Sequence, residues 1–377
     1  MKTVYLDYNA TTPVAPEVFS AMRPYLEGCY GNPSSTHSFG QTARDGLETA
    51  RVRVAGLLGT TPAEIVFTGS GTESNNLAIF GVTRSCRRDR GHLITSSVEH
   101  PAVVEVCRQL AADGWSVTWL PVDGAGRVDP DDVRRAVRPD TCLVSVMHAN
   151  NEVGTIQPLR EIAALLRERG ILFHADAAQS VGKLRCRVDE LGVDLLTVAG
   201  HKLYAAKGVG ALYVRTGVRI EPFVRGAGQE GGRRPGTENV AGIVGLGAAC
   251  ELAAAEGASR PTHLGQMRDL LLALLDSELD DICRHGVPAP VLPNTLSVGI
   301  GGVSVTDLMA TLEGVAASAG AACHGAGGEP SATLKAMGVP AHYALGTLRL
   351  STGRPTTEEE IRAAAARIIA AVRKLRH

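Results

Sequence analysis

Strand-like apolar runs alternate with helix-period segments through much of the chain, and this alternation constrains the fold most. The helical stretches 42–58 and 159–169 lie between such runs. Seven strands are predicted: Ile65–Phe67, His92–Thr95, Val117–Leu120, Cys142–Val146, Ile171–His174, Leu195–Val198 and, after a tight turn at Lys207-Gly208, Gly210–Val214. The pattern is typical of an α/β protein with a largely parallel sheet, because each helix returns the chain to the start of the next strand.

The pattern of helical and strand-like segments changes beyond about residue 241. An alanine-rich helical stretch runs to about residue 256; helical segments at 264–275 and 305–312 and strand-like segments at 294–299 and 347–351 follow. Thr357 and Glu360 form a capping box for a final helix with an apolar stripe at Ile361, Ile368, Ile369 and Val372. We predict a large domain over 15–255 and a smaller α+β domain formed by 1–14 and 256–377.

The charge balance argues against two classes of partner. The formal net charge is -1 among 377 residues, so there is no excess of positive charge that would indicate direct nucleic-acid binding. No apolar run is long enough to span a bilayer, and the start, MKTVYLDYNATTP, lacks the features of a signal peptide. We therefore expect a cytoplasmic protein that does not bind membranes.

The eight cysteines show no CxxC pair and no zinc spacing, so the sequence predicts no metal site. In a reducing compartment most of them are expected to be small core residues. Cys323 differs from the others, because glycines and a polar residue surround it in the stretch SAGAACHGAGGEPS.

A glycine-containing loop, Thr68–Asn76, follows the first predicted large-domain strand and opens into a helix. Free amides at a helix N-terminus bind anions, and phosphate is the natural guest, although an ordinary strand-to-helix turn has the same pattern. Ser74 stands where a dinucleotide fingerprint needs its third glycine, and no Gly-Lys-Ser/Thr triplet follows. A single phosphate monoester is therefore the expected ligand.

Four more predicted strands are followed by polar residues: His100; Asn150 and Asn151; Asp176 and Gln179; and His201 and Lys202. Each has an ordinary structural explanation alone, such as a helix cap or a satisfied core histidine. Together they are expected to meet at one edge of the sheet, because the carboxyl ends of parallel strands share that edge.

A phosphate cradle, an acid and a lysine in one crevice indicate pyridoxal 5'-phosphate. The lysine forms a Schiff base, and a carboxylate on the pyridine nitrogen makes the ring an electron sink. His100 is suited to stack on the ring. Gln179 or Asn151 is suited to donate a hydrogen bond to the phenolic oxygen.

At this point the motifs resemble a known family, the cysteine desulfurases of the NifS/IscS type, which are fold-type I pyridoxal-phosphate enzymes. The resemblance covers essentially the whole chain and rests on YLDYNATTP, GNPSSTHSFG, FTGSGTESNN, SSVEHPAV, MHANNEVGTIQP, HADAAQSVGK, GHKLYAAKGVGALYV, RRPGTEN, the Cys323 loop and LRLSTGRPTTEEEI. It implies a large domain with a mostly parallel seven-stranded sheet between helices and a smaller α+β domain.

The resemblance also implies roles for individual residues. Lys202 would hold the cofactor, Asp176 would pair with its pyridine nitrogen, and His100 would stack on the ring and belong to the catalytic set. The other implied cofactor ligands are Gln179, Asn151, Gly71, Thr72, His201 and, from the partner subunit of a homodimer, Thr237. Asn151 and Arg349 would bind the substrate, with Arg349 gripping its carboxylate. Cys323 would be the nucleophile that forms a persulfide.

One departure concerns Ala199, because many relatives carry a serine hydroxyl there as a phosphate donor. The Gly-His-Lys and Gly-Ala-Ala-Cys-His patterns are shared with selenocysteine lyases and with desulfurases of DNA phosphorothioation. The expected reaction is the conversion of L-cysteine to L-alanine, with sulfur passed through Cys323 to a protein acceptor. The acceptor stays open between iron–sulfur assembly, tRNA, DNA modification and other pathways. Selenocysteine lyase, a non-catalytic sulfur carrier and, more remotely, a cysteine protease are the alternatives.

The glycines after Cys323 predict a carrier arm, because the sulfur must visit a buried substrate and then a partner at the surface. Residues 322–328 are accordingly expected to be mobile. Residues 329–331 are expected to anchor the arm by starting a helix.

Overall fold

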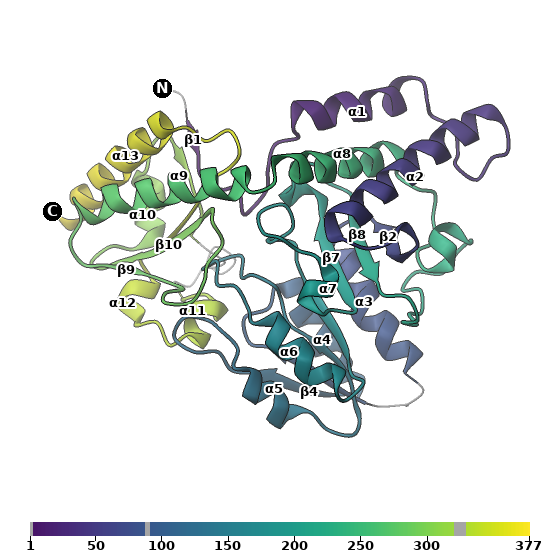
Figure 1. Cartoon of the computed structure of the whole chain (residues 1–377). Coiled ribbons are helices and arrows are strands. Elements are labelled where there is room, and N and C mark those ends of the chain that lie inside the picture. The colour runs from purple at the N-terminus through teal and green to yellow at the C-terminus, as the bar shows by residue number, and fades with distance from the viewer. Residues whose placement is uncertain (1–2, 87–90, 320–328) are drawn as a thin grey trace.

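The computed structural model describes residues 3–86, 91–319 and 329–377. Its main sheet has seven strands in the order β2-β8-β7-β6-β5-β3-β4 (Figure 1). The strands are β2 (Ile65–Thr68), β3 (His92–Ser96), β4 (Ser116–Leu120), β5 (Thr141–Ser145), β6 (Leu172–Asp176), β7 (Leu195–Ala199) and β8 (Gly210–Val214). All neighbours are parallel except β8, which is antiparallel to β2 and β7. The predicted α/β fold with a mostly parallel sheet is confirmed.

Helices cover both faces of this sheet. They are α1 (Pro16–Glu27), α2 (Ser38–Leu58), α3 (Gly71–Ser85), α4 (Pro101–Ala112), α5 (Pro130–Ala136), α6 (Leu159–Arg167), α7 (Val188–Leu191) and α8 (Val240–Glu256). Leu143 and Leu195 pack into a core with α3 and α4. The next residues, Val144 and Leu196, pack into the core on the other face with α2, α6 and α8. Successive strand residues point to opposite faces, so a sheet covered on both sides explains why the strands are apolar throughout.

A second region contains two smaller sheets. A three-stranded antiparallel sheet has the order β12-β10-β9, and β1 pairs with β11 in parallel. Its elements are β1 (Val4–Tyr5), α9 (Ser259–Asp276), β9 (Ile282–Arg284), β10 (Thr295–Ile300), α10 (Val305–Thr311), β11 (Val315–Ala316), α11 (Ala332–Ala336), α12 (Ala341–Ala344), β12 (Thr347–Ser351) and α13 (Glu358–Arg376). Figure 1 shows α9, α13 and β10 gathered on the opposite side of the molecule from α3 and α4. Val4 and Leu6 share a core with residues from Met267 onward, while the exact domain boundaries stay a prediction.

Two predicted helix starts are confirmed. Thr357 and Glu360 form the capping box of α13. Ser331 caps α11, with its Oγ accepting a hydrogen bond from the Leu334 amide at 3.1 Å. The predicted mobile arm at 322–328, and Cys323 with it, lies outside the described residues.

The cysteines follow the prediction in part. Cys107, Cys186 and Cys250 are buried core residues. Cys86 and Cys142 instead form a disulfide between the end of α3 and β5. Their separation of 56 residues gives no spacing signal, since only the packing of α3 against the sheet brings them together.

Among the helices that the structure describes, none is both long and apolar enough to cross a membrane alone. Only α8 and α9 taken together pass that test, and a bend of 80° separates them.

Candidate active site

Nine of the predicted site residues line one cavity of about 450 Å³ at the carboxyl edge of the main sheet. They are Gly71, Thr72, His100, Asn151, Asp176, Gln179, His201, Lys202 and Arg349. Thr237 is exposed and does not line the cavity of its own chain. The sheet topology thus brings together residues that lie up to 278 positions apart, from Gly71 to Arg349.

The first wall of the cavity is the turn between β2 and α3. Ser70 caps α3 by accepting a hydrogen bond from the Glu73 amide at 3.0 Å. A side chain at Gly71 would place its Cβ only 2.9 Å from the Cβ of Ala199. Gly71 and Ala199 are therefore matched small residues that keep a helix N-terminus close to β7 and open to an anion.

Asp176 ends β6 and is held on both carboxylate oxygens. Asn75 donates to Oδ2 at 2.7 Å, and the Ala178 amide donates to Oδ1 at 2.9 Å. Both bonds fix the orientation of this buried carboxylate. The sequence reasoning missed Asn75; its place one helical turn after Gly71 was the signal, since that spacing returns to the same helix face.

Lys202 lies in a short 3-10 turn, Gly200–Lys202, that follows β7. Its Nζ donates to the backbone carbonyls of Asn9 at 2.5 Å and Ala10 at 2.7 Å. Burial, followed by the positive charge of Arg349, lowers the pKa of the Lys202 amine to about 8. Near neutral pH a much larger fraction of this amine is unprotonated than in an exposed lysine.

Two histidines border the cavity. His100 caps α4, with Nδ1 accepting from the Ala102 amide at 3.1 Å, so in the neutral ring Nε2 carries the proton. His100 opens onto the cavity, but the surrounding protein removes enough water to lower its pKa. Burial, with help from the charge of Lys202, lowers the pKa of His201 to about 4.

Arg349 reaches the cavity from β12 of the second region. It donates to Asp7 Oδ1 at 2.8 Å and to the Asn151 carbonyl at 3.1 Å. Its Nε is buried and finds no hydrogen-bond acceptor among the described residues. Because buried donors are almost always paired, this donor marks a place for a ligand oxygen.

Glu99 is a further cavity residue that the sequence reasoning missed. Its Oε1 accepts from the Ser96 hydroxyl at 2.5 Å and from the Met147 amide at 2.9 Å. Burial raises the pKa of the Glu99 carboxyl to about 8. Glu99 is therefore mainly a neutral acid below that pH, and contributes no competing negative charge beside Asp176.

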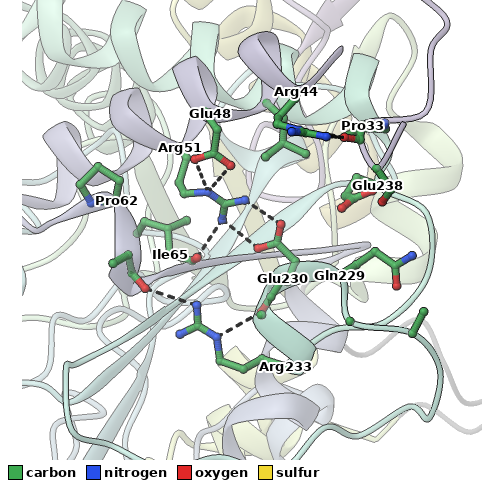
Figure 2. Close-up of a pocket in the computed structure, with 16 residues that line it drawn as sticks. Pro33, Arg44, Glu48, Arg51, Pro62, Ile65, Gln229, Glu230, Arg233 and Glu238 are labelled. Atoms are coloured by element: carbon green, nitrogen blue, oxygen red, sulfur yellow. Dashed lines mark hydrogen bonds and ion pairs between the residues drawn. The ribbon is translucent and has the colours of Figure 1, made fainter. Parts of the chain in front are cut away.

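A second cavity, of about 850 Å³, lies between α2 and the loop 227–238 and holds none of the predicted site residues. Figure 2 shows Arg51 at its centre, directed at both carboxylate oxygens of Glu230. Glu230 also accepts from the Phe67 amide at 2.8 Å. The charged groups at the centre of this larger cavity therefore already pair with each other. In the described part of the chain, no group of three or more metal-ligating side chains is gathered.

Comparisons with known proteins agree with this fold and site. The family model described as aminotransferase class-V matches residues 4–363. A curated relative from Dictyoglomus turgidum, named cysteine desulfurase IscS, is 46% identical over 362 residues, which is 96% of this chain and 92% of the relative. A solved NifS-like protein has a TM-score of 0.92 at 36% identity, covering 99% of this chain and 100% of that one. Another structure, SspA in complex with cysteine, has a TM-score of 0.83 at 36% identity, covering 93% and 98%.

A mostly parallel sheet with a lysine, an acid and a helix N-terminus at its carboxyl edge defines the class. The chain belongs to the aminotransferase class-V family. Within that family it is similar to proteins named cysteine desulfurase and NifS-like.

Proposed function

We propose that this protein is a pyridoxal-phosphate-dependent cysteine desulfurase. It converts L-cysteine to L-alanine and leaves the sulfur as a persulfide on Cys323. The observation that carries the proposal is the meeting of three groups in one cavity: a lysine of lowered pKa, a carboxylate held by two donors, and an arginine with a buried donor that has no acceptor among the described residues. The names of the relatives and of the cysteine-bound neighbour support the same reaction.

The residues present fit the cofactor. The helix end at Gly71 and Thr72, with His201 beside it, offers donors for a phosphate, and Ala199 leaves room there. The other proposed ligands are Asp176 for the pyridine nitrogen, His100 for the ring face, Gln179 for the phenolic oxygen, Asn151 beside both cofactor and substrate, and Lys202 for the covalent bond. Thr237 is exposed in its own chain, so we assign it to the phosphate site of a second copy in a homodimer.

The bound cofactor would supply an electron sink for the charge that develops at the substrate α-carbon. Arg349 binds the substrate carboxylate through Nε, the donor for which the described residues offer no acceptor. Lys202 Nζ takes the α-proton, which its lowered pKa favours near neutral pH. Asn75 and the Ala178 amide orient the Asp176 carboxylate through two hydrogen bonds.

The thiolate of Cys323 attacks the substrate sulfur. The carbon–sulfur bond breaks and a sulfur–sulfur bond forms, so the substrate carbon is reduced while sulfur is oxidised to the persulfide level. No external oxidant is needed, and protons complete the alanine product. We propose that the thiolate of a protein acceptor in the cytoplasm attacks the outer sulfur of this persulfide, takes that sulfur and releases the Cys323 thiolate.

The test is the Cys323→Ala variant. We expect it to bind the cofactor with the same visible absorbance as the wild type but to release no alanine from cysteine, because the acceptor of the sulfur is lost. The matched control is Cys283→Ala, which removes a partly buried thiol outside the site and should keep turnover. Unchanged alanine release in Cys323→Ala would refute the nucleophile assignment. Turnover confined to selenocysteine would instead indicate a lyase.

A further inference from the structure

Lys183 is a buried lysine that the proposed reaction does not use. It follows β6 and is only 7% exposed. Its Nζ donates two hydrogen bonds, at 3.1 Å to Asn9 Oδ1 and at 2.9 Å to Gln179 Oε1. Both acceptors are neutral amide oxygens. An ammonium group buried without a carboxylate is costly, so a long apolar side chain would suit this position better if it served packing alone.

The first consequence concerns the side-chain amide of Gln179. Its Nε2 donates to the Asn9 carbonyl at 2.9 Å, while its Oε1 accepts from Lys183. Turning this amide over would place its NH₂ group against the donating amine of Lys183, and its oxygen against a carbonyl. The Lys183 amine and the Asn9 carbonyl together therefore favour one orientation of Gln179, in which the second hydrogen of Nε2 stays available. Gln179 lines the active-site cavity, where that hydrogen can be used.

The second consequence concerns Asn9, on which the site residues converge. Its carbonyl oxygen accepts from both Lys202 and Gln179. Its side chain accepts from Lys183 and donates to Thr295 at 2.8 Å in β10. Lys183 therefore holds the acceptor of the Lys202 amine in place through Asn9, at the contact between the main sheet and the second region.

The electrostatics agree with this geometry. Burial, and next the positive charges of Lys202 and Arg349, lower the pKa of Lys183 well below its ordinary value. A group of reduced proton affinity still donates hydrogen bonds through its remaining N–H groups. It also adds less positive charge beside Lys202 than an ordinary lysine would.

We propose that Lys183 is a positioning residue, which fixes the Gln179 amide and the Asn9 segment so that a donor faces the phenolic oxygen of the cofactor. The inference rests on the proposed function, because it assigns Gln179 to that oxygen. Lys183 would act on the chemistry only through its two amide partners.

The experiment uses Lys183→Met, which keeps the length of the side chain and removes the donors. Without substrate, the pH midpoint of the visible absorbance of the bound cofactor should rise by about half a unit or more. The reason is that the phenolic oxygen loses a donor and holds the proton at the neighbouring Lys202 nitrogen more tightly. Lys335→Met, at an exposed lysine of α11, is the matched control and should leave the midpoint unchanged.

A double-mutant cycle distinguishes positioning from general structural support. In a Gln179→Ala background, Lys183→Met should add little further shift, because both changes remove the same interaction. An equal shift in both backgrounds, or none in either, would overturn the proposal. If Lys183→Met does not fold, Lys183→Gln retains a shorter donor and enters the same cycle. A wild-type protein that binds no pyridoxal phosphate would instead refute the proposed function itself.

Discussion

The active-site cavity and the cavity beside α2 both contain basic side chains, but the partners of these side chains differ. Beside α2, Arg51 meets both carboxylate oxygens of Glu230, whose side chain is only 2% exposed. Among the described residues, Lys202 in the active site donates only to backbone carbonyl oxygens, and Lys183, which lies beside this cavity, donates only to amide oxygens. These two lysines therefore lack the carboxylate partner that Arg51 has, although Arg349 of the smaller cavity does pair with Asp7.

This difference separates a structural cluster from a functional one. In a complete buried ion pair each charge already has its partner, but breaking the pair leaves a bare charge in the interior. Lysines without carboxylate partners have lowered pKa values, and such perturbed groups concentrate where catalysis needs them. The volume of a cavity alone does not make this distinction.

The largest expected effect tests the active-site half of this comparison. Lys202→Met should reduce alanine formation from cysteine by at least about 10³-fold, since it removes both the covalent attachment and the proton acceptor. The cofactor-free variant should be as stable as the wild type or more stable at pH 7. Below pH 8 the folded wild type carries the cost of a buried charge that methionine lacks. Turnover assays and urea unfolding of the cofactor-free protein measure the two quantities.

Lys374→Met is the control for this prediction, because Lys374 is an exposed lysine of α13. It should change neither quantity. A large loss of stability in Lys202→Met would mean that this lysine supports the fold, and the contrast with Arg51 would fail.

The second prediction tests the other cavity. Arg51→Met should lower the free energy of unfolding by about 3–5 kcal/mol, because it leaves the buried Glu230 carboxylate without its cation. Arg51 also donates to the Ile65 carbonyl at 2.9 Å, so the edge of the main sheet loses a contact as well. Urea unfolding monitored by circular dichroism measures the change.

Arg23→Met provides the comparison on the surface. Arg23 pairs with Glu27 at 2.7 Å, but the two side chains are 65% and 62% exposed. Removing this pair should cost no more than about 1 kcal/mol. Similar losses of unfolding free energy in the two variants would show that burial does not determine how much the Arg51 pair contributes to stability.

Much of the site was predictable because the parallel sheet obeys a simple rule. His100, Asp176 and Lys202 each follow an apolar run, and the carboxyl ends of parallel strands meet at one edge. Asn75 and Lys183 were missed because their roles depend on which neighbour they face. That information lies in the packing of α3 and of the turn after β6, not in the order of residues.

Contacts between distant segments were harder to predict. Asn9 lies in the sequence far from Lys202, and its carbonyl becomes the acceptor of that lysine only through the tertiary fold. The disulfide between Cys86 and Cys142 likewise depends on tertiary packing. The role of Thr237 depends on a second copy, so it stays a prediction.

The smallest predicted effect concerns a buried side chain that is neutral near pH 7, unlike the cation of the Arg51 pair. His174 is buried in the main sheet, where it bonds to the Ser145 hydroxyl at 2.8 Å and the Thr197 hydroxyl at 3.1 Å. Burial lowers its pKa to about 4. Between pH 6.5 and 4 the unfolded chain binds a proton that the folded chain does not, so stability falls as the pH falls through this window. The loss from this residue should be at most about 3 kcal/mol.

His174→Gln removes the titrating group, so the unfolding free energy of the variant should fall less steeply between pH 6.5 and 4 than that of the wild type. Urea unfolding of the cofactor-free protein at several pH values measures both slopes. His342→Gln, at an exposed histidine, is the control and should leave the slope of the wild type intact. If His174→Gln has that same slope, other groups cause the acid sensitivity. Burial among neutral hydrogen-bond partners would then lower pKa values in this protein less than we infer for Lys183 and Lys202.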